Sequence, residues 1–303
     1  MGWGAPRAMT KLRYEVVAIF GPTASGKSAV AEQLAEALGT EVVSADALQV
    51  YRGLSILTNQ PTTPTRLVAI RDLRETMSVG EYAGLAHEAI DELVAEHGTA
   101  VVAGGTGLYL RAALVDLEIP PAVTASARST LESSYDADAR GAYDRLRLLD
   151  PSAAAAVHPN DRRRVVRALE LAEIGASLAP GDDRLWSKDT RRPSLVVGLD
   201  LPSEALGRRI AARTDEMIRR GVVAEARAAK RASPSLTAAK ALGLDELTTL
   251  PVHEARSRII ERTRRYAAYQ RKWMGRIPGI VLIDADRPPG QVADAILDVA
   301  RAR

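Results

Sequence analysis

The first third of the chain alternates between short apolar runs and longer segments whose apolar residues recur at helical spacing. Two β-rich apolar runs are YEVVAIF (14–20) and TEVVSAD (40–46), the second of which ends in a carboxylate. Between them lies KSAVAEQLAEALG (27–39), a predicted helix that ends at a glycine suited to a C-cap. A second amphipathic helix is predicted for SVGEYAGLAHEAIDELVAEHG (78–98), and a strand, a glycine turn and a helix are predicted for TAVVAGGTGLYLRAAL (99–114). This alternation predicts a parallel sheet covered by helices.

The pattern changes near residue 118. From 118 to 180 the chain is rich in Ala, Arg and Leu and predicts helices only, whereas SLVVGLDLP (194–202) and GIVLIDAD (279–286) return to strand character. Long basic helices are predicted between these two strands. We therefore expect an α/β core made of residues 11–117 and 181–303, interrupted by an inserted all-helical subdomain at 118–180.

Composition limits the possible classes of protein. The chain has 303 residues, of which 46% are hydrophobic and 26% charged, as in ordinary globular proteins. It has no cysteine, which excludes disulfides, zinc–thiolate sites and thiol nucleophiles. The net charge is only +3, so a site for a polyanion should be a local patch of arginines. Because no apolar run approaches the roughly 18 residues of a membrane helix and no signal peptide is evident, we expect a cytoplasmic protein. Nothing in the sequence suggests a subunit interface, so we also expect a monomer.

The strongest motif is GPTASGKS at residues 21–28, directly after the first predicted strand. It has the G-x-x-x-x-G-K-S spacing of a phosphate loop (P-loop), whose backbone N–H groups surround phosphate oxygens at a helix N-terminus. Lys27 supplies a positive charge, and Ser28 is placed to bind Mg²⁺. The predicted fold is therefore P-loop kinase-like. The residues expected to bind a diphosphate or triphosphate are Gly21, Pro22, Thr23, Ala24, Ser25, Gly26, Lys27 and Ser28.

Asp46, at the end of the second predicted strand, has two interpretations. P-loop NTPases commonly use an Asp at a strand end to hold Mg²⁺. A carboxylate that faces the phosphate site is also suited to act as a general base. The P-loop itself does not decide whether the chain hydrolyses a nucleotide, transfers a phosphoryl group, or holds a different diphosphate.

The chain resembles the tRNA dimethylallyltransferases, also called tRNA isopentenyltransferases. The segments that carry the resemblance, in the family's order, are GPTASGKS, SADALQVYRG, AGGTGLYLRA, DPSAAAAVHPNDRRRVVRALE, GLDLP and TRRYAAYQRKW, and they extend from about residue 15 to about 285. Members of this family move a dimethylallyl group from its diphosphate to N6 of an adenine, at position 37 beside the tRNA anticodon. The resemblance implies that the P-loop holds the diphosphate of the prenyl donor, with Mg²⁺, as a leaving group.

The resemblance also assigns residues near the reacting atoms. Asp46 matches the base that accepts the proton of the adenine amine. Thr23 in the P-loop and Thr106 in GGTGLY match residues close to the reacting atoms, and Arg213 matches an arginine near the diphosphate. The catalytic candidates are thus Asp46, Thr23, Thr106 and Arg213, with Ser28 as the metal ligand.

A further group of residues matches the family's tRNA contacts. Basic residues neutralise phosphates. Tyr266 and Trp273 have two interpretations: they are core aromatics, or they stack on a base that leaves the anticodon loop. The insert at 118–180 is therefore expected to bind the tRNA anticodon stem-loop. The candidates for tRNA binding are Asp46, Ala47, Leu48, Gln49, Arg128, Arg163, Arg164, Arg167 and Gln270.

The chain departs from the family pattern at several positions. Ala47 stands where Ser is usual, Arg163 where Gln is usual, and Tyr269 where Arg is expected. The sequence TNQP at 58–61 resembles the adenylate isopentenyltransferases, which act on free AMP, ADP or ATP, and this is one alternative function. A P-loop nucleotide kinase is another. The block HPNDRRRVVRALE favours tRNA, because a free nucleotide needs no such basic arm.

Overall fold

The computed structural model shows two compact units. The residues that it describes are 12–117, 124–179, 185 and 187–302. The larger unit comprises Met1–Asp116 and Leu185–Arg303, and the smaller unit is Leu117–Arg184. Within the described ranges, no helix combines the length and the apolar character needed to cross a bilayer.

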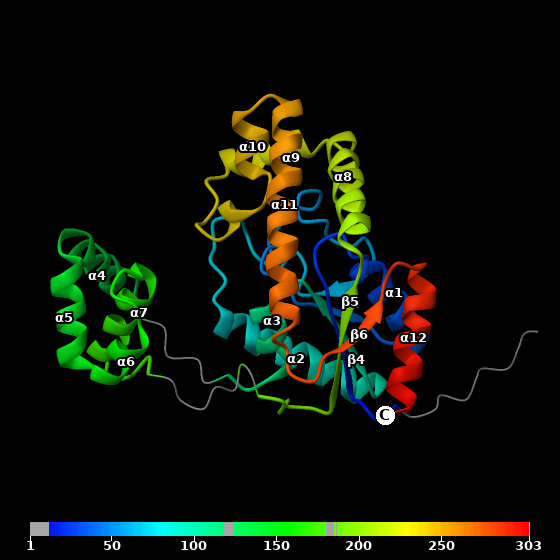
Figure 1. The fold of residues 1–303 in the computed structure, drawn as a ribbon, viewed down its shortest axis with the longest axis horizontal. Helices are drawn as coiled ribbons and strands as arrows, with labels where there is room; N and C mark the ends of the chain where they lie inside the picture. Colours follow the sequence, from blue (N-terminus) through cyan, green and yellow to red (C-terminus); the bar gives the residue numbers. More distant parts are fainter. Residues whose placement is uncertain (1–11, 118–123, 180–184, 186, 303) are drawn as a thin grey trace, which may run out of the picture. The chain divides into compact units, whose positions relative to one another are not determined.

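A six-stranded sheet with every neighbouring pair parallel forms the centre of the larger unit (Figure 1). The strand order is β3-β2-β4-β1-β5-β6. The strands are β1 (Val16–Phe20), β2 (Val42–Ser44), β3 (Thr65–Arg66), β4 (Ala100–Gly104), β5 (Ser194–Asp200) and β6 (Val281–Asp284). Phe20, at the end of central β1, lies opposite Gly104 on one side and Gly198 on the other. The predicted parallel sheet is confirmed, and its register brings the segments that follow β1 and β4 side by side.

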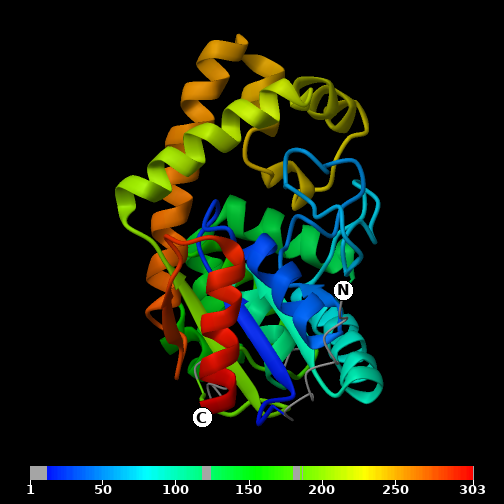
Figure 2. The ribbon, with the colours of Figure 1, turned by 90° about the vertical axis from the view of Figure 1, so that its right-hand side faces the viewer.

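Helices cover this sheet and extend beyond it. Val17 and Ile19 of β1 are fully buried and belong to one apolar core with Leu34 of α1 and Ile296 of α12. The long helices α8 and α11 pack on each other and rise beyond the edge at which the strands end (Figure 2). The helices are α1 (Lys27–Leu38), α2 (Val79–His97), α3 (Gly107–Leu114), α8 (Ser203–Arg219), α9 (Val222–Arg231), α10 (Leu244–Thr249), α11 (Val252–Met274) and α12 (Pro289–Ala302), with a short 3₁₀ helix η2 (Ala238–Lys240).

The described part of the smaller unit contains helices and no strand, as its composition predicted. Leu146, Val165 and Leu169 are buried in its own apolar core. The helices are α4 (Ala125–Ala137), α5 (Ala139–Leu149), α6 (Pro151–Ala156) and α7 (Arg162–Glu173). Each helix begins after an N-cap residue whose side chain accepts a hydrogen bond from the backbone N–H three residues later. The four N-cap residues are Thr124, Asp138, Asp150 and Asp161. These caps explain why four short helices follow one another so closely.

Candidate active site

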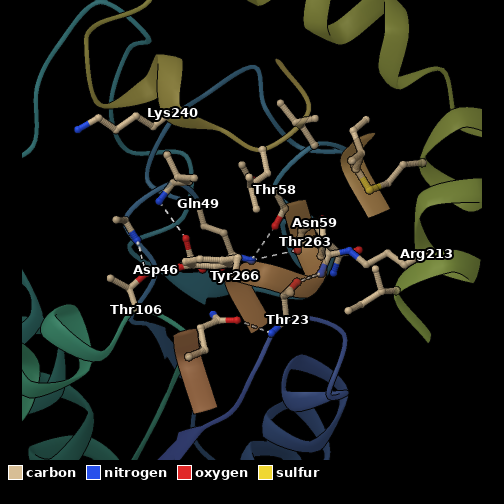
Figure 3. A pocket seen from close by; sticks show the side chains of 18 of the residues that line it. Thr23, Asp46, Gln49, Thr58, Asn59, Thr106, Arg213, Lys240, Thr263 and Tyr266 are labelled. Atoms are coloured by element: carbon tan, nitrogen blue, oxygen red, sulfur yellow. Dashed lines mark hydrogen bonds between the residues drawn. The ribbon is translucent and has the colours of Figure 1, made fainter. Parts of the chain in front are cut away.

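A cavity of about 330 Å³ lies where the strands of the larger unit end (Figure 3). Its walls come from the P-loop, from the segments that follow β2 and β4, and from helices α8 and α11. Among the described residues that line it, Asp46 is the only carboxylate, and the cations are Lys27, Arg213 and Lys240. The excess of positive charge suits an anionic ligand.

The P-loop has the backbone shape that its sequence predicted. β1 ends at Phe20 and α1 begins at Lys27, so the loop joins a strand directly to a helix N-terminus. Gly26 has φ 93°, in the left-handed region that favours glycine. A Cβ atom on Gly21 would lie 2.6 Å from the Ser25 Oγ. The two glycines therefore permit the tight turn that directs the first N–H groups of α1 toward a bound anion.

Lys27 projects into the cavity, and its amino group donates to the Pro22 carbonyl at 3.5 Å. Desolvation by the surrounding protein lowers the pKa of Lys27 to about 8, although the charge of Asp46 opposes this change and that of Arg213 adds to it. A bound diphosphate would supply the negative charge that this ammonium group needs in order to stay protonated.

Arg213 reaches the P-loop from α8. Its Nη1 donates to the Thr23 Oγ1 at 2.8 Å, and both side chains line the cavity. Desolvation lowers the pKa of Arg213, while the charge of Asp46 raises it. The guanidinium remains charged at any physiological pH, because its ordinary pKa is so high. The structure thus brings Thr23, Lys27, Arg213 and Asp46 to one cavity, as the sequence led us to expect.

Asp46 follows β2, and its orientation is fixed by a local turn. Its Oδ1 accepts a hydrogen bond from the Leu48 N–H at 2.9 Å. The Ala47 N–H donates to the Thr106 Oγ1 at 3.5 Å, which joins this segment to the one that follows β4. The pairing of Ser44 with Ala103 in the sheet sets that contact. In the view of Figure 3, Asp46 and Thr106 lie on one side of the cavity and Arg213 lies on the other.

The glycines of GGTG allow close approach by other elements. A Cβ atom on Gly104 would lie 2.0 Å from the Ala45 carbonyl oxygen, and one on Gly107 would lie 2.2 Å from the Trp273 ring. Trp273 therefore packs against the start of α3, and its Nε1 donates to the Tyr269 hydroxyl at 2.8 Å. Both contacts are within the protein, so the structure gives Trp273 a packing role.

Tyr266 of α11 also lines the cavity. Burial raises the pKa of its hydroxyl to about 12 and the charge of Asp46 adds to this rise, while a hydrogen bond with Thr106 acts against it. The hydroxyl is therefore protonated at neutral pH. The aromatic ring of Tyr266 lies near Asp46 (Figure 3).

Some of the residues of the larger unit that were expected to contact tRNA line the cavity, and others have side-chain amides that are hydrogen-bonded within the protein. Ala47 and Leu48 line the cavity. Gln49 lines it too, but its Oε1 accepts from the Ser44 hydroxyl at 2.8 Å and its Nε2 donates to the Asn59 carbonyl at 3.0 Å. The amide of Gln49 thus holds the cavity wall together. Gln270 is likewise bonded to the protein, as described below.

Glu225 of α9 is a residue that the sequence did not single out. Its carboxylate accepts hydrogen bonds from the Ser55 hydroxyl at 2.9 Å, the Ile56 N–H at 2.9 Å and the Leu57 N–H at 2.7 Å. It therefore fixes the segment that carries Leu57, which lines the cavity. No local signal marks Glu225, because it is 168 residues from Leu57 in the chain.

The arginines of the smaller unit differ in their surroundings. Arg128 and Arg167 bind the two carboxylate oxygens of Glu170, at 2.5 and 2.9 Å. Glu170 is only 1% exposed. Burial alone would raise its pKa, but the hydrogen bonds from the two arginines bring that pKa below its ordinary value. Arg163 and Arg164, in the first turn of α7, are exposed. The cluster thus separates into arginines that neutralise a buried charge and arginines that face solvent.

The fold and the cavity together define a P-loop α/β protein whose cavity, with one carboxylate among its described lining residues, is suited to a phosphorylated ligand. Comparison with models of protein families identifies the family within this class. The model of the IPP transferase family matches residues 49–277, which is more than half of the chain. The chain belongs to the IPP transferase family, whose members are enzymes.

Individual relatives agree with this assignment. The chain is 40% identical to a tRNA dimethylallyltransferase of Salinispora arenicola, over 95% of this chain and 87% of that protein. It is 38% identical to a tRNA dimethylallyltransferase of Streptomyces coelicolor, over 88% of each chain. Among solved structures, it is similar to a tRNA isopentenylpyrophosphate transferase of Bacillus halodurans, with 30% identity, a TM-score of 0.66, and coverage of 95% of this chain and 96% of that one. A eukaryotic dimethylallyltransferase acting on tRNA matches with 27% identity and a TM-score of 0.71, over 89% of this chain and 73% of that one.

Proposed function

We propose that this protein transfers a dimethylallyl group from dimethylallyl diphosphate to N6 of adenine 37, next to the anticodon of a tRNA. The observation that carries the proposal is the cavity in which Asp46 meets Lys27 of the P-loop and Arg213 of α8. The names of the relatives support the donor and acceptor classes. We also propose that it acts as a monomer in the cytoplasm.

In the proposed reaction, the bond between C1 of the allyl group and its diphosphate oxygen breaks, and a bond from C1 to N6 of the adenine forms. Negative charge develops on the pyrophosphate that leaves. Lys27, Arg213 and the first N–H groups of α1 are placed to stabilise that charge. Asp46 takes the proton that N6 loses. The reaction therefore uses the P-loop to stabilise a leaving group.

Magnesium fits the oxygen donors of this cavity. The Ser28 hydroxyl and the Asp46 carboxylate both line it. No group of three or more His, Cys, Asp or Glu side chains suited to a metal is present in the described part of the chain. Mg²⁺ commonly binds through one or two protein oxygens together with phosphate oxygens and water. We propose Ser28 as its ligand, and bound Mg²⁺ would neutralise part of the charge of the diphosphate.

The acceptor adenine has to leave the stack of the anticodon loop to reach Asp46. We propose that Tyr266 offers its ring to the extruded base, because it lines the cavity beside Asp46 and Thr106. The phosphates of the anticodon stem are expected to contact the exposed Arg163 and Arg164.

A transfer assay tests the proposal. The protein, Mg²⁺ and radiolabelled dimethylallyl diphosphate are incubated with unmodified tRNA or with AMP. We expect label in tRNA alone, and in N6-isopentenyladenosine after digestion. Label in AMP alone would mean a free-nucleotide enzyme, and label in neither, together with tight ATP binding, would mean a P-loop nucleotide kinase.

Replacing both Arg163 and Arg164 with Ala is expected to weaken tRNA binding. The slope of log K against log salt concentration should fall by about 2, one for each lost phosphate contact. Filter binding at several salt concentrations measures this slope. A matched control replaces Arg140 and Arg147, which are exposed on α5 of the same unit, and should leave the slope within about 0.5 of that of the parent protein. An unchanged slope in the first variant would place the RNA surface elsewhere.

Donor binding is expected to weaken above pH 8. Lys27 has a pKa of about 8 in the free protein, and a bound diphosphate favours its protonated form. Below pH 8 the lysine is mostly protonated, so its contribution to affinity levels off. Above pH 8, affinity should fall about tenfold per pH unit until the pKa of the bound state is reached. Calorimetry with dimethylallyl diphosphate and no tRNA measures this. The Lys27→Arg variant stays protonated and should lack the dependence, and a parallel decline in both proteins would exclude Lys27 as its source.

A further inference from the structure

Gln270 of α11 occupies a central position between two parts of the cavity wall. It is 2% exposed. Its Oε1 accepts a hydrogen bond from the Thr23 N–H at 2.7 Å, and its Nε2 donates to the Gly105 carbonyl at 2.8 Å. One side-chain amide thus joins the P-loop to the turn that carries Thr106.

The surroundings of Gln270 are built around this amide. A Cβ atom on Gly105 would lie 2.3 Å from its Nε2, so the second glycine of GGTG makes room for it. Thr23 is also held through its side chain, because Arg213 of α8 donates to its Oγ1. The P-loop at Thr23 is therefore fixed by two helices, one through the backbone and the other through the side chain.

The two contacts use both functional atoms of the amide. The Oε1 is engaged by the P-loop, the Nε2 is engaged by Gly105, and the side chain has almost no exposed surface. The family resemblance led us to expect a direct tRNA contact from Gln270. Its observed partners instead lie on the donor side and on the acceptor side of the proposed reaction.

We propose that Gln270 is a positioning residue, which holds the P-loop and the Thr106 turn at the separation that in-line transfer requires, and that it makes no contact with tRNA. The inference rests on the proposed function and deepens it. Attack of N6 on C1 needs the two reacting atoms to be held near van der Waals contact, and a displacement of about 1 Å costs about 100-fold in rate. A single amide that spans both walls sets this separation.

The Gln270→Met variant keeps the length of the side chain but loses both hydrogen bonds. We expect its single-turnover rate to fall by about 100-fold and its Kd for magnesium pyrophosphate, measured without tRNA, to rise by about tenfold. Its Kd for tRNA should stay within about twofold of the parent value, because a positioning residue contributes no RNA contact. Gln291→Met on α12, at an exposed position outside the cavity, is the matched control and should change none of the three.

The Gln270→Glu variant adds a readout that a purely structural role would not produce. A protonated carboxyl group can accept from Thr23 and donate to Gly105, as the amide does, whereas the ionised form cannot donate. The ratio of its single-turnover rate to that of the parent protein should therefore rise as the pH falls. Lys27, Arg213, Asp46 and Tyr266 line the same cavity, and Tyr266 also shares a hydrogen bond with Gln270. The pH profile of Gln270→Met, which lacks the amide and has no carboxyl group, is therefore recorded as the reference for changes in the titration of these neighbours.

Three results would overturn the inference. The first is an unchanged rate and pyrophosphate affinity in Gln270→Met, and the second is a loss of tRNA affinity alone, which would make Gln270 an RNA contact. The third is a rate ratio for Gln270→Glu that does not vary with pH. A parent protein that binds pyrophosphate and labels no tRNA would instead overturn the proposed function.

Discussion

Replacing Asp46 with Asn is expected to lower the single-turnover rate of prenyl transfer by about 1,000-fold, within the range for loss of a general base. Asn retains the oxygen that accepts the Leu48 N–H, so the turn after β2 should persist. The amide cannot take the proton that N6 loses. Because the change acts on the chemical step, the Kd for tRNA should stay within about threefold of the parent value.

The control for Asp46→Asn is Asp72→Asn. Asp72 also accepts a backbone N–H bond from the residue two positions onward, Arg74, at 3.1 Å, but it does not line the cavity. Rapid-quench measurements at saturating tRNA give the rates of both variants. A rate for Asp46→Asn within about tenfold of the parent protein would refute the assignment of Asp46 as the base.

Replacing Lys27 with Met is expected to reduce kcat/KM for dimethylallyl diphosphate by about 1,000-fold, as expected for the removal of a charge that stabilises a leaving group. Binding of magnesium pyrophosphate should weaken as well, whereas Asp46→Asn should leave that binding nearly intact. The two variants therefore separate stabilisation of the leaving group from proton removal.

The unfolding temperature of Lys27→Met gives a second measurement. Desolvation lowers the pKa of Lys27 to about 8, which means that the folded protein without ligand disfavours its charge. At pH 7 the variant should therefore unfold at a temperature equal to or above that of the parent protein. Lys188→Met, at an exposed position outside the cavity, should match the parent protein in both measurements. Normal pyrophosphate binding by Lys27→Met would exclude the lysine from the donor site.

The parts of the fold that could be predicted from sequence are those with a local signal. The strand that ends at Phe20, the turn with Gly26 and the helix that starts at Lys27 adjoin one another, and each depends on neighbouring residues. Asp46 could be singled out for the same reason, because it lies two residues after the end of β2. The helical insert could be predicted from its composition, since short capped helices need few long-range contacts.

The contacts that organise the site were not predictable from local patterns. Gln270 is 247 residues from Thr23, and Arg213 is 190 residues from it. Only the packing of α8 and α11 beyond the sheet brings these side chains to the P-loop. The pattern of charges in the sequence also could not predict which arginine is paired. Arg163 and Arg167 belong to the same arginine cluster, but of these two only Arg167 forms an ion pair with the buried Glu170.

The place of the insert in the chain has a consequence for synthesis on the ribosome. The smaller unit ends at Arg184, and its core residues lie between Leu131 and Leu169, so it can fold as soon as it emerges. The central strand β1 must wait for β5, which follows the insert, before its second edge is paired. The helical unit can therefore be complete while one edge of β1 is still unpaired, and an unpaired strand edge favours aggregation of the growing chain.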